Sequence, residues 1–264
     1  MLASLPMYYP PQGSLAAFWS ALAGLLQQQG VDAPAQLQMP EDVLHHWLQP
    51  DLLLSQTCGY PLVHTLKDRV QVVGTLAYEA TGAQGIHCQS QLICRATDAR
   101  RNLAAWEGST VAYNARDSQS GYNALRHSVA LASGARPFYA RTLATGAHLQ
   151  SVEYVRTGRA DMAAIDAVTW ALFQRTQPVL SRELAVFGQT QAYPGLPLIT
   201  SVHTPPEVLA VLQRSLHTIS TEARFAAVRA PLLICGFEAT QLADYRVCAT
   251  MERETLARGL AHWE

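Results

Sequence analysis

The apolar positions along the chain follow two alternating spacings, and this pattern predicts an α/β fold. Short apolar runs with strand character are followed repeatedly by stretches whose apolar residues recur every three to four positions, as on one face of a helix. The first third of the chain predicts the order strand, helix, strand, helix, strand, which is typical of a largely parallel sheet flanked by helices. The predicted strands are 2–9, 51–56, 69–78, 90–97, 109–114, 160–166, 183–190 and 196–202, and the main predicted helices are 15–30, 120–133, 149–158 and 167–175. The segment after residue 205 is predicted to be mostly helical.

The α/β pattern occurs twice, and no Gly/Ser/Pro-rich linker separates the two occurrences. We therefore expect a chain that crosses between two lobes through strands rather than through a flexible connection. The predicted first lobe combines residues 1–88 with 187–264, and the predicted second lobe is 89–186. A cleft between the lobes is the expected ligand site, since pockets are favoured at such boundaries.

Composition excludes several classes of protein. Of the 264 residues 49% are apolar, only 15% are charged and the net charge is −1, so neither disorder nor binding to nucleic acid or an anionic membrane is expected. The first 13 residues lack the basic and apolar segments of a signal peptide, and apolar runs stay below the length of a membrane span. The five cysteines form no CxxC pair and no zinc-type spacing, so we expect no metal and no cofactor.

The segment AYNARDSQSGYNALRHSV, residues 112–129, places several small polar residues between a predicted strand and a predicted helix. One interpretation is a helix cap provided by Ser118 or Ser120. A second is a serine nucleophile, but the segment lacks the Gly-x-Ser-x-Gly pattern, and the nearest histidine, His127, lies further along the same predicted helix. The third is a binding site for an anion, and these interpretations remain open at this stage.

The anion interpretation rests on the position of the segment between a strand and a helix. The first amides of a helix lack intrahelical acceptors and lie at the positive end of the helix dipole. Gly121 would let a ligand approach the backbone closely, and Ser118 and Ser120 would add hydroxyl donors. Because the segment has neither a lysine nor a nucleotide-type phosphate loop, it favours a small oxyanion over a nucleotide.

A wider set of motifs resembles a known family. The strings STVAYNARDSQSGYNALRHSVA, GAHLQSVEYVRTGRADMAAIDAVTWAL and YPGLPLITS combine a Ser-x-Ser-Gly-Tyr helix start, a histidine before the next helix, and a Gly-x-x-Asp…Asp pattern. Together they resemble the phosphonate-binding family of ABC-transporter solute receptors, which are bilobed type II periplasmic binding proteins. The resemblance extends from the start of the chain to about residue 205.

The resemblance implies a function and a set of ligand contacts. The function would be to capture a small oxyanion, such as phosphonate or phosphate, between two lobes in the periplasm and to deliver it to an ABC-transporter permease, without catalysis. The implied contacts in the second lobe are Ser118, Gln119, Ser120, Gly121, His148 and Asp166. Those in the first lobe are Tyr8, Tyr9, Ser55, Gln56, Thr57 and Tyr60.

Several of these residues have a structural alternative. Asp166 fits the N-cap of a helix as well as it fits a contact to a ligand amine, and His148 could cap the helix that begins near Leu149. Tyr8 and Tyr9 would point to opposite sides of a strand, so at most one of them would face a cleft.

The sequence also leaves two alternative functions open. They are a cytoplasmic ligand sensor and an enzyme on the same bilobed fold, for which Cys58 is the one candidate thiol.

Overall fold

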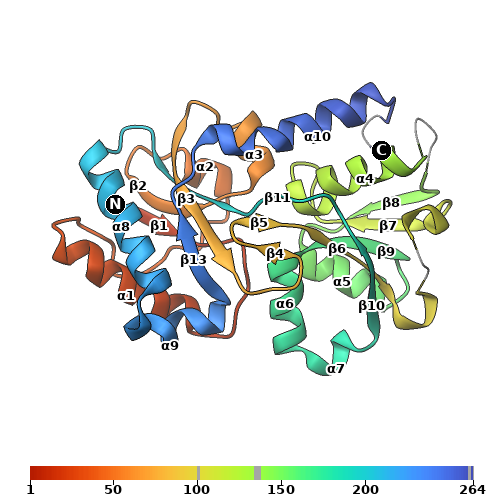
Figure 1. The fold of residues 1–264 in the computed structure, drawn as a ribbon, viewed down its shortest axis with the longest axis horizontal. Coiled ribbons are helices and arrows are strands. Elements are labelled where there is room, and N and C mark those ends of the chain that lie inside the picture. The colour runs from red at the N-terminus through yellow and green to blue at the C-terminus, as the bar shows by residue number, and fades with distance from the viewer. Residues whose placement is uncertain (100–101, 134–137, 261–262, 264) are drawn as a thin grey trace. The chain divides into compact units, whose positions relative to one another are not determined.

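The protein forms two compact units, drawn in Figure 1 from a computed structural model that describes residues 1–99, 102–133, 138–260 and 263. Unit 1 contains Met1–His87 and Pro194–Tyr245, and unit 2 contains Cys88–Tyr193 and Arg246–Glu264. Each unit has its own five-stranded sheet with helices packed on it, so the predicted α/β class is confirmed.

The unit 1 sheet has the strand order β1-β2-β12-β3-β13. Strand β1 pairs with β2 in parallel, β12 is antiparallel to both β2 and β3, and β13 is antiparallel to β3. It follows that β1, β2 and β3 run in the same direction and end at the same end of the sheet. The strands are β1 (Leu2–Ser4), β2 (Leu52–Gln56), β3 (Val70–Tyr78), β12 (Pro197–Ser201) and β13 (Ile234–Glu238).

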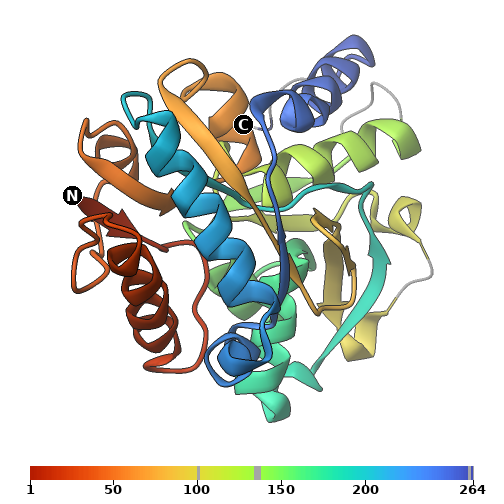
Figure 2. The same cartoon turned by 60° about the vertical axis from the view of Figure 1, so that its left-hand side comes forward.

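Helices cover both faces of the unit 1 sheet. Helix α8 (Pro206–Thr221) packs on β3 and β13, and its other neighbours are α1 (Ser14–Gln28) and α9 (Ala226–Arg229). Figure 2 shows α8, in lighter blue, running alongside β3 and β13. The short helices α2 (Val43–Trp47) and α3 (Gly59–His64) belong to a second cluster that buries Trp47, Leu62 and Tyr245.

The unit 2 sheet has the strand order β10-β6-β9-β7-β8. Strands β7, β8 and β9 are parallel, whereas β6 is antiparallel to β9 and to β10. The carboxyl ends of β7, β8 and β9 therefore lie at the same end of the sheet as the start of β6. The strands are β6 (Ser90–Arg95), β7 (Thr110–Tyr113), β8 (Arg141–Ala144), β9 (Met162–Asp166) and β10 (Leu184–Gln189).

Two apolar clusters bury the two faces of the unit 2 sheet. One contains Val152 and Val155 of α5 (His148–Arg156) together with Trp170 and Phe173 of α6 (Ala167–Thr176). The other contains Leu125 and Val129 of α4 (Ala124–Ser133) and Tyr122, which lies just before this helix. Trp263 belongs to the same cluster. Helix α10 (Arg246–Ala257) packs against α4 in the same unit, and α7 (Pro178–Ser181) packs against α6.

The division into units differs from the predicted lobes in two segments. Residues 188–189 pair with β6, and Thr190 bonds with Ser90, so this stretch joins unit 2 rather than unit 1. Residues 246–264 also join unit 2, because the Asn123 side chain donates to the Cys248 carbonyl and the Trp263 backbone N–H donates to the Tyr122 hydroxyl. The short pairings of β5 (His87–Cys88) and β11 (Tyr193–Pro194) lie where the chain passes between the units, and β4 (Ala83–Gln84) precedes them.

One predicted strand boundary is wrong, and two short strands of the five-stranded sheets were not predicted. The first strand ends at Ser4 instead of residue 9, because Pro6, Pro10 and Pro11 cannot donate backbone hydrogen bonds to a sheet. The segment after residue 205 is mostly helical, as predicted, but it also contains one short strand, β13, that the sequence did not predict. Strand β8 was not predicted, and it is a short strand at the edge of the unit 2 sheet with partly exposed residues.

Within the described residues, the helices are too short or too polar to cross a membrane.

Candidate functional site

Polar residues from four strands gather at one end of the unit 2 sheet, which we call the carboxyl end. Residues 118–121 follow β7, His148 begins the helix after β8, and Asp166 ends β9. Ser90 begins the antiparallel strand β6 and is paired with Asp166 in the sheet register. The parallel order of β7, β8 and β9 thus brings together residues that are far apart in the sequence, at the sheet end where ligands bind in many α/β proteins.

Ser118 is the N-cap of the helix that follows β7. Its Oγ accepts a hydrogen bond from the Gly121 N–H at 3.1 Å, which confirms the capping interpretation. The helix begins with a π-helical turn, Gln119–Asn123, and continues as α4. The Asn123 N–H accordingly bonds to the Ser118 carbonyl at 3.0 Å, five residues back. Such π-turns often occur at functional sites.

The Ser120 hydroxyl lies 2.7 Å from Nε2 of His148, a contact that the sequence did not predict. Burial lowers the pKa of His148 to about 4, although the Ala164 backbone carbonyl acts in the opposite direction. The imidazole is therefore neutral at neutral pH. Ser118 Oγ is 3.4 Å from Ser120 Oγ, so both hydroxyls and the imidazole form one cluster.

Gly121 is required by close packing. A Cβ at this position would overlap Oδ1 of Asn114 and would lie 3.0 Å from Cε1 of His148. The space beside Gly121 is thus filled by protein side chains, which differs from the expectation that a ligand would occupy it. The backbone N–H of Gly121 is also engaged, since it donates to Ser118.

Gln119 is buried and bonded within unit 2. Its Nε2 donates to the Met251 sulfur at 3.2 Å, and its Oε1 accepts from Nδ2 of Asn123 at 2.8 Å. The predicted ligand contact of Gln119 is therefore limited to its backbone amide, which lies in the first turn of the helix.

Asp166 is buried and caps α6. Its Oδ1 accepts from the backbone N–H groups of Val168 and Thr169 at 2.9 and 3.1 Å, so the N-cap interpretation is confirmed. Burial raises the pKa of the nearby Cys88 thiol, and the Asp166 carboxylate raises it further, so that thiol stays protonated. A carboxylate at this place supplies one negative charge at the carboxyl end of the sheet.

Ser90, Thr190 and Tyr193 also lie at this end, although the sequence did not single them out. The Ser90 hydroxyl donates to the Ser120 carbonyl at 2.8 Å and lies 2.7 Å from the Tyr193 hydroxyl. The Ser90 N–H donates to Oγ1 of Thr190 at 2.9 Å. The antiparallel direction of β6 is what brings Ser90 here, and apolar periodicity carries no information about that direction.

The candidate residues of unit 1 lie at the ends of its parallel strands, but several are bonded internally. The Ser55 hydroxyl lies 2.7 Å from Ser4 Oγ and accepts from the Trp47 indole N–H at 3.2 Å. The Gln56 side chain donates to the Tyr78 hydroxyl at 3.2 Å. These groups stabilise the interior of unit 1.

The remaining unit 1 candidates differ in exposure. The Tyr8 ring is buried edge-on against Tyr78, with 5.4 Å between centroids, whereas Tyr9 is 61% exposed. Tyr60 is half-buried beside His64. Thr57 is fully buried, and its hydroxyl has no hydrogen-bond partner among the described residues. A buried hydroxyl without a partner is costly, which distinguishes Thr57 from the internally bonded Ser55 and Gln56.

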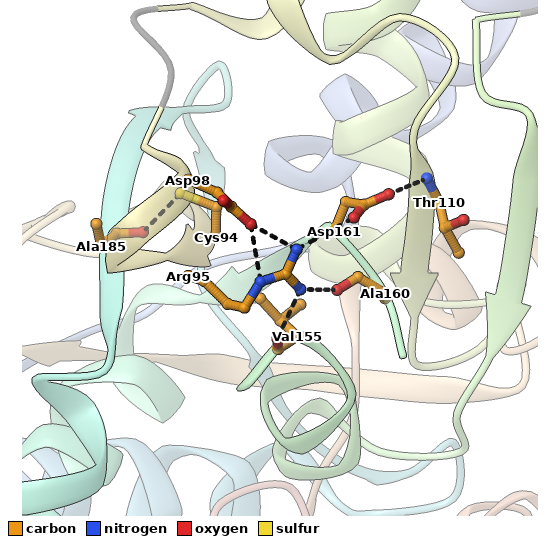
Figure 3. Close-up of polar contacts among 8 residues, drawn as sticks. All are labelled: Cys94, Arg95, Asp98, Thr110, Val155, Ala160, Asp161 and Ala185. Carbon is orange, nitrogen blue, oxygen red and sulfur yellow. Dashed lines mark hydrogen bonds and ion pairs between the residues drawn. The ribbon is translucent and has the colours of Figure 1, made fainter. Parts of the chain in front are cut away.

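The opposite end of the unit 2 sheet, the amino end, carries an ion-pair cluster. Figure 3 shows the Arg95 guanidinium between Asp98 and Asp161, with its Nη1 also donating to the Ala160 carbonyl at 2.9 Å. The carboxylate of Asp161 also accepts from the Thr110 N–H at 2.7 Å. Asp161 thus has a structural role at the amino end of the sheet.

The sequence matches one protein family over residues 11–245, described as "ABC transporter, phosphonate, periplasmic substrate-binding protein". A comparison with curated protein sequences finds no significant match.

Solved structures share the fold at low sequence identity. A binding protein component of an ABC phosphonate transporter from Pseudomonas aeruginosa has 20% identity and a TM-score of 0.72, covering 97% of this chain and 88% of that one. PhnD1 from Prochlorococcus marinus, solved with methylphosphonate, has 12% identity and a TM-score of 0.76, covering 97% and 98%. XAC2383 from Xanthomonas citri, solved with ATP, has 15% identity and a TM-score of 0.70, covering 98% of each chain. These likenesses establish the two-lobed periplasmic-binding-protein fold for this chain.

Proposed function

Because the chain belongs to the phosphonate-binding family of periplasmic substrate-binding proteins of ABC transporters, we propose that it binds a small phosphonate- or phosphate-type oxyanion. The proposed binding site, which we call the oxyanion seat, consists of Ser118, Ser120, His148 and the first backbone amides of the helix that starts at Gln119. The protein would then deliver this ligand to an ABC-transporter permease.

The single observation that carries the proposal is the clustering of two serine hydroxyls and an imidazole at the start of a helix. Ser118 and Ser120 are 6% and 4% exposed, so a ligand held there would be largely removed from water. Hydrogen bonds to an anion are stronger in such a low-dielectric setting than in water. The positive end of the helix dipole favours the same negative charge.

The hydroxyl proton of Ser118 is available to an anion. Ser118 Oγ accepts from the Gly121 N–H, and its closest hydroxyl neighbour, Ser120 Oγ, is 3.4 Å away, which is long for a hydroxyl–hydroxyl hydrogen bond. An oxyanion oxygen at ordinary distance would be a better acceptor than Ser120. We therefore assign Ser118 as a primary donor of the seat.

Asp166 adds a preference among oxyanions. Its buried carboxylate would attract a ligand that also carries an ammonium group, and it would repel an additional anionic group. Methylphosphonate, the ligand in the Prochlorococcus structure, and 2-aminoethylphosphonate are therefore the two informative ligands for this chain.

The Ser120–His148 contact also resembles the nucleophile–base pair of a hydrolase, but the pKa of His148 argues for binding. An efficient general base has a pKa near the working pH, whereas the pKa of His148 is lowered to about 4. The imidazole is thus a weak base, suited to orienting the Ser120 hydroxyl.

The test is titration calorimetry of ligand-stripped protein with methylphosphonate, phosphate and sulfate. The double variant Ser118→Ala/Ser120→Ala is expected to bind its best ligand about 10- to 100-fold more weakly, since hydrogen bonds to charged groups are removed. A matched control is Ser128→Ala/Ser133→Ala on the same helix, whose hydroxyls bond to the carbonyls of Ala124 and Val129. Equal affinities of the seat variant and the wild-type protein would contradict the proposed seat.

A further inference from the structure

A series of hydrogen bonds leads from Tyr193 to the oxyanion seat, and every donor in it points the same way. The Ser90 hydroxyl has one proton, and the Ser120 carbonyl at 2.8 Å can only accept it. The Tyr193 hydroxyl, 2.7 Å from Ser90 Oγ, must therefore donate to Ser90. The chemistry of the acceptors thus fixes the direction of both bonds.

The series continues through a peptide bond. The carbonyl of Ser120 and the N–H of Gly121 belong to the same amide, so a hydrogen bond received by the carbonyl makes the N–H a stronger donor. This N–H donates to Ser118 Oγ at 3.1 Å. A hydroxyl oxygen that accepts a hydrogen bond becomes in turn a stronger donor through its own proton.

We infer that Tyr193 and Ser90 are positioning residues that polarise the Ser118 hydroxyl toward the bound oxyanion. The order of donation is Tyr193 hydroxyl, Ser90 hydroxyl, Ser120–Gly121 amide, Ser118 hydroxyl, anion. Tyr193 and Ser90 do not need to touch the ligand for this effect. The inference rests on the proposed function, because it describes how the same seat gains strength.

Burial lets this polarisation operate. Ser90 is fully buried and Tyr193 is 3% exposed, so water does not compete for these hydroxyls. Ser90 is also held in place from the backbone, since its N–H donates to Thr190 and its carbonyl accepts from the Thr190 N–H at 3.0 Å. Cooperative strengthening is on the order of 10–30% per bond and is attenuated at each successive bond, so the loss of the Tyr193 hydroxyl should weaken oxyanion binding by less than about 1.5-fold.

The test replaces Tyr193 by phenylalanine, 3-fluorotyrosine and 3,5-difluorotyrosine in the full chain, at a pH at which each phenol remains protonated. Fluorine makes the phenol a stronger donor without adding a hydrogen-bonding group of similar strength. Two quantities are measured, namely the Gly121 amide proton shift of the ligand-free protein by NMR and the affinity for methylphosphonate by calorimetry.

We expect both quantities to follow the acidity of residue 193. The Gly121 amide proton should move upfield in Tyr193→Phe and downfield with each added fluorine, and affinity should fall and rise in the same order. In a Ser90→Ala background the response to residue 193 should disappear. A residue that merely fills space would give no such ordering.

Tyr139 provides the control, because it is half-buried in the same unit and its hydroxyl donates to the Met162 sulfur at 3.4 Å. The same replacements at Tyr139 should leave the Gly121 shift and the affinity unchanged. A Gly121 shift that does not respond to residue 193 would overturn the inference, even if methylphosphonate binds. If the wild-type protein binds no oxyanion, the proposed function fails, while the Gly121 shift still decides whether the amide is polarised.

Discussion

Strands β6 and β9 of unit 2 each carry polar residues at both ends, and the two ends of the sheet use them differently. At the amino end, Arg95 pairs with Asp98 and Asp161 and bonds to two backbone carbonyls. At the carboxyl end, Ser90 and Asp166 lie beside neutral hydroxyls, and the donor series there ends on the Ser118 proton.

The comparison shows why full charges do not by themselves mark a binding site. The guanidinium of Arg95 satisfies the protein's own carboxylates and carbonyls, so little of its donor capacity is left for a ligand. The carboxyl end has no such cation among the residues described in its seat, but it has oriented neutral donors and the start of a helix. Such donors are available to an anionic ligand, as the proposed function requires.

The largest expected effect is on the free energy of unfolding at acidic pH. It should depend on His148, at the carboxyl end of the unit 2 sheet. Unfolded His148 binds a proton below about pH 6.5, but the folded residue does so only near pH 4, so the unfolded state binds more protons between these values. The free energy of unfolding should therefore fall by up to about 3 kcal/mol as the pH drops through this window. Chemical denaturation at several pH values, compared with His148→Gln, measures this contribution.

As the pH drops, the free energy of unfolding of His148→Gln should fall by less than that of the wild-type protein. The difference should be up to about 3 kcal/mol. His46, whose pKa burial also lowers, is common to both proteins and cancels in the difference. Identical pH profiles of the two proteins would show that the pKa of His148 is not lowered in the folded protein.

The next effect concerns Gly121→Ala. The added methyl group would overlap Asn114 and press on His148, so we expect a loss of about 1–3 kcal/mol in unfolding free energy and a displaced Ser120–His148 pair. Binding of methylphosphonate should weaken as well. Thermal denaturation and calorimetry measure the two losses.

Gly24→Ala is the control for this substitution. Gly24 lies inside α1, and a methyl group on its Cα would point into open space, so this variant should gain about 0.5–1 kcal/mol of stability. If Gly121→Ala were also stabilising, the packing at the seat would be looser than described.

The same substitution at the two ends of β9 gives a direct comparison. Asp166→Asn keeps a side chain that can cap α6 but removes its charge, so 2-aminoethylphosphonate should bind about 10-fold more weakly while methylphosphonate changes little. Asp161→Asn should cost at most about 1 kcal/mol of stability, since its pair with Arg95 is partly exposed, and it should leave both affinities unchanged. Equal losses for both ligands in Asp166→Asn would mean that Asp166 is only a helix cap.

The smallest effect is expected in unit 1, at Thr57. Thr57→Val keeps the shape of the side chain and removes this buried hydroxyl. The same change should raise the stability of the ligand-free protein, because it removes a polar group without a partner among the described residues. Ser55→Ala is the contrast, since it breaks bonds to Ser4 and Trp47 and should lower stability alone. A Thr57→Val protein that is less stable than the wild-type protein would contradict the description of Thr57 as a hydroxyl without a partner among the described residues.

Much of the fold could be predicted from apolar spacing, because buried faces of strands and helices impose their own period on the sequence. The helix cap at Ser118 was predictable as well, since capping depends on residues within one turn. Strand β13 was missed because its segment, Ile234–Glu238, lies between helical stretches and is too short for its alternation to stand out.

The details of the site depend on pairing over long sequence distances, which local patterns do not encode. Ser55 and Thr57 are two residues apart at the end of the same strand, yet one hydroxyl is bonded internally and the other has no partner among the described residues. Ser90 and Tyr193 reach Ser120 only through the sheet order. Residues 246–264 join unit 2 through contacts to α4 and Tyr122, and spacing within that segment does not reveal its partner.

The central claim is that the oxyanion binds at the start of the helix after β7. The most direct measurement is an NMR titration of the isotope-labelled, ligand-stripped protein with methylphosphonate, following the backbone amides of Ser120 and Gly121 and the His148 ring. The account predicts saturable shifts at all three, with the Arg95 and Asp161 signals unmoved. Saturable binding that leaves Ser120, Gly121 and His148 unshifted would contradict it.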